Sequence, residues 1–120
     1  MSRQIPIAVV AGARTPFAKA FTDLQAASAV ELGRIALLDA LRRCGLSGAD
    51  VDEVVMGNVA SPPDAANLAR VIALKADLPI DRVAHTVNRN CASGMESILG
   101  GWQAINEQRA TIVVAGGTES

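Results

Sequence analysis

The stretch from Arg82 to Ile105 constrains the fold of this chain more than any other. It opens with a short run rich in β-branched residues, Val83-Ala84-His85-Thr86-Val87, which is typical of a buried strand. A polar turn follows, after which large apolar residues recur at helical spacing: Met95, Ile98, Leu99, Trp102 and Ile105. The sequence therefore predicts a buried strand over 82–88, a turn, and a helix with one apolar face.

The predicted turn presents a single cysteine, Cys91, just before the helix. Ser93 and Glu96 have the spacing of a capping box, so we expect the helix to begin within one or two residues of Cys91. The free N–H groups and the dipole of a helix N-terminus stabilise a nearby anion. They also suit the oxyanion formed when a nucleophile attacks a carbonyl group. Position alone leaves two interpretations open, a reactive nucleophile and an inert core residue, because cysteine is often buried.

The remaining elements alternate between strands and helices. Three further strands are predicted, over 5–11, 51–60 and 110–115, and Gly116-Gly117 is expected to end the last one. Two further helices are predicted, over 65–76 and from Ser28 to about Cys44, where Gly45 is a suitable stop. The order βαβαβαβ indicates an α/β fold, with a mostly parallel sheet and helices on both faces. Cys91 lies where a strand ends and a helix begins, which is where functional groups collect in such sheets.

Composition excludes several classes of function. The 120 residues carry 11 basic and 12 acidic side chains, so no charge excess favours nucleic acid or an anionic membrane. No apolar run approaches the roughly 18 residues of a membrane span, and no signal peptide or mitochondrial presequence is visible. The two cysteines, Cys44 and Cys91, suggest neither a disulfide framework nor a metal site. We therefore expect no metal and a reducing compartment, the cytoplasm, with Cys44 in the core.

Two other groups near Cys91 are candidates for function. His85 is the only histidine, but six residues of extended strand span roughly 20 Å, so we do not expect it to act as the base for Cys91. Asn88, Arg89 and Asn90 fit two interpretations equally, as contacts for a substrate or a neighbouring subunit, and as turn residues.

Four stretches, in this order along the chain, resemble the thiolase family. The window Val87-Asn88-Arg89-Asn90-Cys91-Ala92-Ser93-Gly94 is similar to the family's motif around its acyl-accepting cysteine. The family's opening strand and turn resemble Ala11-Gly12-Ala13-Arg14-Thr15-Pro16-Phe17. The start of its helix before the cysteine strand resembles Asn67-Leu68-Ala69-Arg70. The end of its fourth strand resembles Ala115-Gly116-Gly117-Thr118-Glu119-Ser120. The resemblance covers essentially the whole chain.

The resemblance implies an acyltransferase, an acetyl-CoA C-acyltransferase or acetyltransferase, with Cys91 as the catalytic nucleophile. Cys91 would take an acyl group from acyl-CoA as a thioester and pass it to CoA or to a second acyl-CoA. The reaction is then thiolytic cleavage of 3-ketoacyl-CoA or Claisen condensation of acetyl-CoA, as in fatty acid metabolism. CoA and acyl-CoA are substrates in this interpretation, and no cofactor is covalently bound. The family also suggests a homo-oligomer, a dimer or a tetramer.

The thiolase family draws a histidine and a second cysteine from its C-terminal half, and these 120 residues contain neither segment. We therefore expect residues 1–120 to be an incomplete N-terminal thiolase domain, without the loop domain and C-terminal domain, and inactive alone. Two alternatives remain open at this point. One is a related condensing enzyme of the ketoacyl synthase type, against which Arg14-Thr15-Pro16 and the closing 116–120 stretch argue. The other is a noncatalytic, truncated thiolase-like module.

Overall fold

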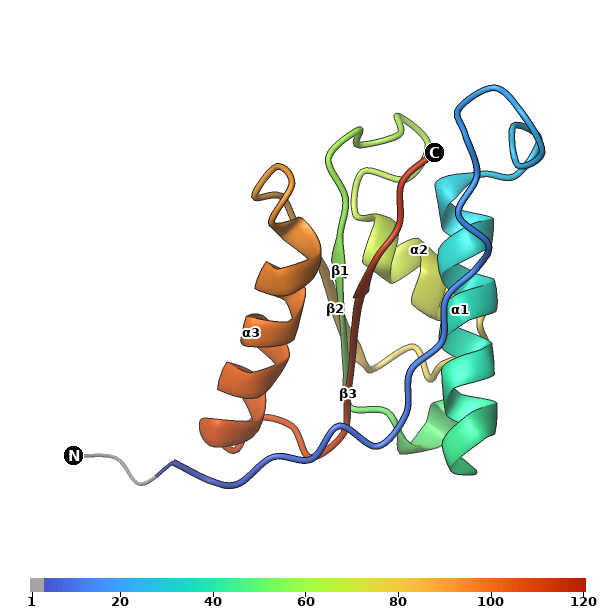
Figure 1. Ribbon diagram of the computed structural model, residues 1–120. Helices are drawn as coiled ribbons and strands as arrows, with labels where there is room; N and C mark the ends of the chain where they lie inside the picture. Colours follow the sequence, from blue (N-terminus) through green and yellow to red (C-terminus); the bar gives the residue numbers. More distant parts are fainter. Residues whose placement is uncertain (1–3) are drawn as a thin grey trace.

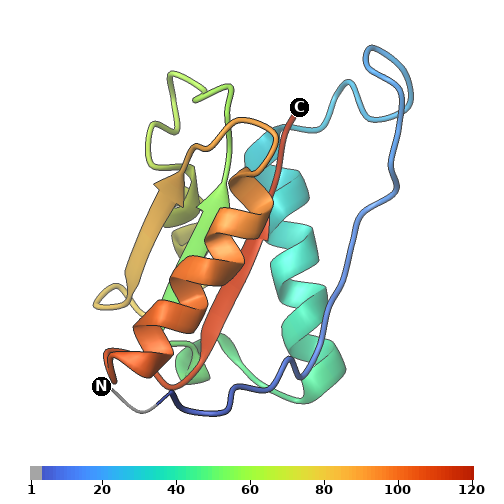
Figure 2. The same ribbon diagram turned by 60° about the vertical axis from the view of Figure 1, so that its left-hand side comes forward.

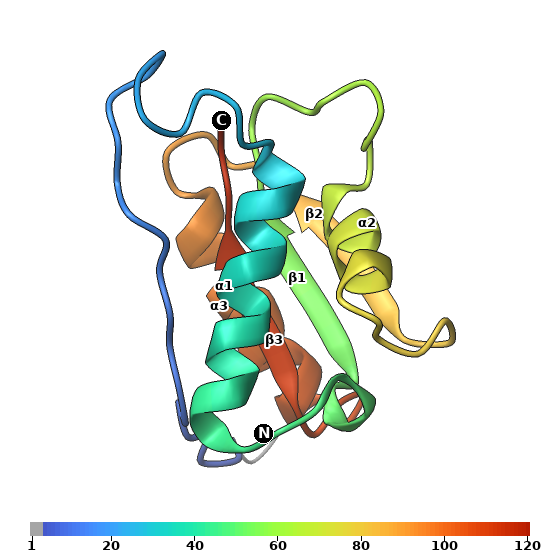
Figure 3. The ribbon, with the colours of Figure 1, turned by 90° about the vertical axis from the view of Figure 1, so that its right-hand side faces the viewer.

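A computed structural model describes residues 4–120 as a sheet between two helical layers (Figure 1). The elements in chain order are α1 (Ala29–Cys44), a short 3-10 helix η1 (Gly48–Asp50), β1 (Glu53–Gly57), α2 (Leu68–Lys75), β2 (Val83–Val87), α3 (Ser93–Asn106) and β3 (Val113–Gly117). Helix α3 covers one face of the sheet, and α1 and α2 cover the other (Figure 3). The predicted α/β fold with helices on both faces is confirmed. Within the described residues, none of the helices is long and apolar enough to cross a membrane.

The sheet has the strand order β2-β1-β3, and both strand pairs are parallel. All five residues of the central strand β1 are buried. Gly57, at the end of β1, pairs with Val87 of β2 on one side and with Gly117 of β3 on the other. The carboxyl ends of the three strands therefore meet at one edge, and the segments that follow them lie side by side there.

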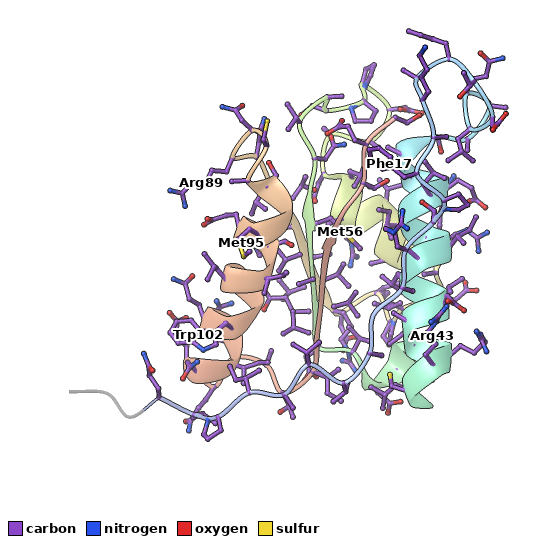
Figure 4. The ribbon with its side chains drawn as sticks, viewed as in Figure 1. Phe17, Arg43, Met56, Arg89, Met95 and Trp102 are labelled. Atoms are coloured by element: carbon purple, nitrogen blue, oxygen red, sulfur yellow. The ribbon has the colours of Figure 1, made fainter. Side chains whose placement is uncertain are left out.

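The main hydrophobic core lies between the sheet and the two helices α1 and α2. Val54 and Met56 project from β1 into this core, and Figure 4 shows Met56 on the side of α1 and α2. The buried helical residues that surround them include Leu37, Leu41, Leu68 and Ile72. The ends of α1 follow the sequence signals: the Ser28 hydroxyl accepts a hydrogen bond from Glu31 N, and Gly45 closes the helix at a φ of 71°.

Helix α3 packs through the face opposite to the predicted one. The residues of α3 that are buried are small: Ser93, Ser97, Gly101 and Ala104. The large apolar side chains point away from the sheet, with Met95 61% exposed and Trp102 38% exposed (Figure 4). The prediction that the stripe from Met95 to Ile105 is the packing face is therefore wrong for most of its members. Small residues allow the helix axis to approach the sheet, and hydrophobicity alone does not reveal this preference.

Residues 5–11 form no strand, so the sheet within residues 4–120 has three strands and not the four of the βαβαβαβ pattern. This segment runs outside the layers, as Figure 2 shows, and Val9 is 90% exposed. Its first described contact is a hydrogen bond from Ile5 N to Asn106 Oδ1. The apolar run has the composition of a buried strand, but a strand forms only where the segment lies along the edge of another strand, and this segment does not lie along β3, an edge strand of the sheet.

Several predicted boundaries also move. Strand β3 spans Val113–Gly117, not 110–115, so Gly116 and Gly117 belong to the strand they were expected to end. Helix α2 begins at Leu68, not at 65, because the Asn67 side chain caps it by accepting a hydrogen bond from Arg70 N. Strand β2 has the expected position but lies at an edge of the sheet, where Val83 is exposed.

Gly57 carries the closest contact between α3 and the sheet. A Cβ atom at this position would lie 2.6 to 2.8 Å from the backbone carbonyl and the Cβ of Ser93, the first residue of α3. Only a residue without a side chain fits this contact. The start of α3 is therefore held directly against the end of β1.

We expect Gly57→Ala to destabilise the chain by about 1–3 kcal/mol, because the added methyl group forces the start of α3 away from β1. Urea denaturation followed by circular dichroism measures the effect. Gly100→Ala is the matched control, since its Cβ would meet Val55 Cγ1 at an ordinary 3.7 Å, and Ala replaces Gly in a helix with a gain of about 0.5–1 kcal/mol. Equal stability of the two variants would contradict this account.

Asp52 joins the start of β1 to the segment that leads into β3. Its Oδ2 atom accepts hydrogen bonds from the backbone N–H groups of Ile112, at 3.0 Å, and Thr111, at 2.8 Å. These two hydrogen bonds are the main cause that lowers the pKa of the Asp52 carboxyl, and the charge of Arg82 lowers it further. The ionised form of Asp52 is therefore favoured in the folded chain.

Because the folded-state pKa of Asp52 is depressed, the stability that it contributes is fully present above the unfolded pKa of about 3.9. This contribution is lost as the pH falls through the folded pKa. We expect Asp52→Asn to lower the free energy of unfolding by about 1 kcal/mol at pH 7 and by less at pH 3. Urea titrations at both pH values test this expectation, which fails if the difference between the two proteins does not shrink in acid.

Candidate active site

The turn between β2 and α3 is built by its own polar side chains. Asn88 Oδ1 accepts a hydrogen bond from Asn90 N at 3.0 Å, and Asn90 has a left-handed φ of 52°. The Arg89 guanidinium reaches forward along α3 to Glu96, with 2.7 Å between Nη1 and Oε2 (Figure 4). These contacts favour the interpretation of all three residues as turn residues, although Asn90 also lines the cavity described below.

Ser93 joins this turn to the helix in a way that the sequence pattern did not predict. The hydroxyl accepts a hydrogen bond from Arg89 N and donates one to the carbonyl oxygen of Asn90, both at 2.7 Å. Ala92 is the N-cap and makes no side-chain hydrogen bond. The helix thus begins two residues after Cys91, as expected, but the Ser93–Glu96 capping box is wrong. Because Glu96 forms an ion pair with Arg89, the Arg89 guanidinium compensates the negative charge of the Glu96 carboxylate near the start of α3.

Cys91 is exposed and lines an open cavity of about 1270 Å³. The cavity lies at the carboxyl edge of the sheet, between the turn before α3, the loop over 13–25 and the segments that follow β1 and β3. The other cysteine differs in its surroundings. Cys44 is half-buried near the end of α1, and its thiol donates to the Ala40 carbonyl oxygen at 3.3 Å. Of the two thiols, Cys91 is therefore the one placed to meet a substrate.

Glycines bring three backbones together beside Cys91. A Cβ atom on Gly117 would lie 3.6 Å from Gly94 Cα and 3.3 Å from the Gly57 carbonyl oxygen. All three glycines line the cavity. The surface near Cys91 is therefore largely main chain, which includes the first turn of α3. Free N–H groups at such a position stabilise a developing oxyanion or a thiolate without a further charged side chain.

His85 lies elsewhere. It is on the face of β2 that α3 covers in part, with Nδ1 3.5 Å from Oε1 of the buried Glu53, and it is not among the residues that line the cavity. Glu53 Oε2 lies 3.3 Å from Arg109 Nη1. This arrangement agrees with the expectation that His85 is not the base for Cys91. Residues 4–120 also contain no cluster of three or more His, Cys, Asp or Glu side chains placed to hold a metal ion.

Two polar residues at this edge were not singled out from the sequence. Asn58 follows β1 and Glu119 follows β3, and their side chains hydrogen-bond at 3.1 Å between Nδ2 and Oε1. Glu119 lines the same cavity as Cys91. The available signal was positional, since Asn58 lies near the end of the strand predicted over 51–60 and Glu119 follows the Gly116-Gly117 pair expected to end the last strand. Their pairing depends on β1 and β3 being neighbours in the sheet, which the sequence does not state.

Comparison with known protein families gives a match over nearly the whole chain. The family described as "Thiolase, N-terminal domain" matches residues 7–120. An acetyl-CoA acetyltransferase from Schizosaccharomyces pombe is 46% identical over 112 residues, which are 93% of this chain and 28% of that protein. A cytosolic acetyl-CoA acetyltransferase from Gibberella zeae is 43% identical over 120 residues, 100% of this chain and 30% of the relative. A 3-ketoacyl-CoA thiolase from Yersinia enterocolitica is 36% identical over 114 residues, 95% of this chain and 26% of the relative.

Solved structures agree with these relatives. The acetyl-CoA acetyltransferase of Bacillus anthracis superposes with a TM-score of 0.90 at 35% identity, over 93% of this chain and 28% of that chain. The Acat5 thiolase of Ascaris suum, solved in complex with coenzyme A, superposes with a TM-score of 0.89 at 36% identity, over 92% of this chain and 29% of that chain.

The curated relatives are much longer than this chain, which spans between 26 and 30% of the three compared here. The family match and the relatives' names favour the thiolase interpretation over the ketoacyl synthase type. Over 7–120 this chain belongs to the thiolase family, as a thiolase N-terminal domain.

Proposed function

We propose that Cys91 is the acyl-accepting nucleophile of a thiolase-type acyltransferase. The observation that carries this proposal is the exposed Cys91 thiol at the start of α3, in a cavity at the carboxyl edge of a parallel sheet. The names of the relatives, acetyl-CoA acetyltransferase and 3-ketoacyl-CoA thiolase, support the same chemistry. Covalent transfer through a thiol divides one difficult acyl exchange into two easier steps.

In the first step, the Cys91 thiolate attacks the carbonyl carbon of an acyl-CoA. The carbonyl oxygen takes up the electron pair as an oxyanion, which backbone N–H groups at the start of α3 would stabilise. The N–H groups of Ser93 and Glu96 already donate to the carbonyl oxygens of Asn90 and Ala92, so the remaining ones are the candidate donors. With a simple acyl-CoA, collapse of this intermediate expels CoA as its thiolate. With 3-ketoacyl-CoA, Cys91 attacks the 3-keto carbon, and collapse breaks the C–C bond and expels the α-carbanion of acetyl-CoA, which takes up a proton. In both cases the acyl group is left on Cys91. In the second step, the thiolate of CoA or the α-carbanion of a second acyl-CoA takes the acyl group, and Cys91 returns to its thiolate.

Both steps need a group that moves protons from the thiols or from the α-carbon. His85 lies beside Glu53, with 3.5 Å between Nδ1 and Oε1, and does not line the cavity. We therefore propose that residues 1–120 are the N-terminal domain of a longer protein, whose other domains supply this base. The length of the relatives supports this proposal, as does the outward apolar face of α3, which a further segment would cover.

The substrates we propose are CoA and acyl-CoA, with no covalently bound cofactor. The coenzyme A complex of the Ascaris suum thiolase supports CoA as a ligand of this fold. We further propose a cytoplasmic protein of fatty acid metabolism that forms a homo-oligomer. One relative is described as cytosolic, which supports the location.

The two cysteines should differ in reactivity. With limiting iodoacetamide at pH 7.5, we expect Cys91 to be alkylated roughly tenfold faster than Cys44, because its thiol is exposed at a helix start. Peptide mapping by mass spectrometry measures both rates in one sample. Cys44→Ser and Cys91→Ser are the paired controls. Faster labelling of Cys44 would count against Cys91 as the nucleophile.

We expect catalytic turnover to require residues beyond 1–120. We expect the purified 120-residue chain to show no cleavage of acetoacetyl-CoA by CoA, because His85, the single histidine of the chain, does not line the cavity that holds Cys91. A longer protein that includes the remaining domains should show this activity and lose at least roughly a thousandfold with Cys91→Ala. Cleavage by the 120-residue chain would refute the need for further domains. Stoichiometric acetylation of Cys91 without turnover in the longer protein would instead indicate a noncatalytic module.

A further inference from the structure

The carboxylate of Glu119 binds the loop that leaves β1. Its Oε2 atom accepts a hydrogen bond from Val59 N at 2.9 Å, and its Oε1 atom accepts from Ala60 N at 3.0 Å and from Asn58 Nδ2 at 3.1 Å. One side chain thus satisfies three donors in a row. Hydrogen bonds to an ionised acceptor are stronger than those between neutral groups, so the carboxylate is the main support of this loop.

The Asn58 side chain also joins the loop after β1 to the segment after β3. Asn58 is only 2% exposed, and Nδ2 also donates to the Thr118 carbonyl oxygen at 2.8 Å. On its other side, Asn58 Oδ1 accepts from Ser61 N at 2.8 Å. Ser61 has a left-handed φ of 47°, which turns the chain sharply after Ala60. The loop over 58–61, which we name the β1 loop, is therefore bound to the exit of β3 through Asn58, Val59 and Ala60, and Ser61 is bound back to Asn58.

The β1 loop forms part of the wall of the cavity that holds Cys91. Val59, Ala60 and Glu119 all line this cavity, and the Val59 side chain is 43% exposed. The loop follows Gly57, which lies against the first residue of α3, and Asn58 N donates to the Val87 carbonyl oxygen at the end of β2. The wall and the turn that carries Cys91 thus leave the sheet next to each other.

We propose that Glu119 is a positioning residue that holds Val59 and Ala60 in place and so limits the bulk of the group that reaches Cys91. The inference rests on the proposed function, in which the group that arrives is an acyl thioester. Slender acyl groups pass the wall, whereas groups branched or ring-bearing close to the carbonyl carbon collide with it. Glu119 touches no reacting atom in this scheme and acts through the β1 loop.

Glu119→Gln is the sharpest variant because it keeps the shape and removes the charge. A glutamine offers one acceptor oxygen, and its NH₂ group would face a backbone N–H that also needs an acceptor. We expect the amide protons of Val59 and Ala60 to exchange with solvent roughly tenfold faster or more in this variant. Hydrogen exchange followed by two-dimensional NMR on the 15N-labelled 120-residue chain measures each amide separately.

The consequence for Cys91 is measured with two thiol reagents of different width, iodoacetamide and N-cyclohexylmaleimide. Each rate is divided by the rate of the same reagent with glutathione. We expect the wild-type chain to disfavour the bulky reagent, and Glu119→Gln to reduce this discrimination by roughly tenfold while the iodoacetamide rate changes little. Asp64→Asn is the matched control, since it removes an exposed carboxylate from the same connection between β1 and α2 and does not line the cavity.

Each other outcome has a separate meaning. Unchanged exchange of the Val59 and Ala60 amides would overturn the role of Glu119. Faster exchange with unchanged discrimination would reduce Glu119 to a structural residue and overturn the positioning role. If Glu119→Gln does not fold, Val59→Ala decides, because it shortens the wall and leaves the carboxylate contacts; unchanged discrimination in that variant overturns the proposal. Slow iodoacetamide labelling of Cys91 beside normal amide protection would count instead against Cys91 as the nucleophile.

Discussion

The contact between the end of β1 and the start of α3 is the constraint on which the rest of the structure depends. The Ser93 backbone occupies the space that a side chain at Gly57 would need, and further along α3 a Cβ on Gly101 would lie 3.1 Å from Val113 Cγ1. Because α3 meets the sheet through small residues, its first turn lies directly over the strand ends. The position of Cys91 therefore follows from packing between helix and sheet, and the turn residues adapt to it.

The sequence predicts those elements whose signals are local. The limits of α1 follow from Ser28 and Gly45, and the positions of β1 and β2 follow from their β-branched runs. The segment over 5–11 has an equally strong apolar pattern but forms no strand, because a strand forms only where a segment lies along the edge of another strand, and composition does not reveal where a segment lies. The face of α3 was predicted wrongly for a related reason: hydrophobicity identifies large side chains, whereas close approach selects small ones.

The candidate site also contains one feature that local sequence predicts and one that depends on the strand order. The position of Cys91 between a strand and a helix could be predicted, because a strand, a turn and a helix follow one another without interruption around it. The contact between Asn58 and Glu119 could not, since 61 residues separate them and only the strand order β2-β1-β3 makes them neighbours. Parallel sheets bring together chain segments that are remote in sequence, and the side chains that meet at their carboxyl edge are visible only once the strand order is known.

Two independent kinds of interaction therefore define the two sides of the cavity. The side that carries Cys91 is fixed by apolar and steric contact, through Gly57, Gly117 and the buried face of α3. The β1 loop, which leaves the sheet next to this part of the cavity, is fixed by hydrogen bonds to Glu119, which are strong but local. We expect a substitution in the β1 loop to change the shape of the wall without moving the helix start, because the side-chain hydrogen bonds of Asn58 run to Thr118, Glu119 and Ser61 and not to α3. On the functions proposed above, reactivity of the thiol and selection of the acyl group are then separable properties of one sheet edge.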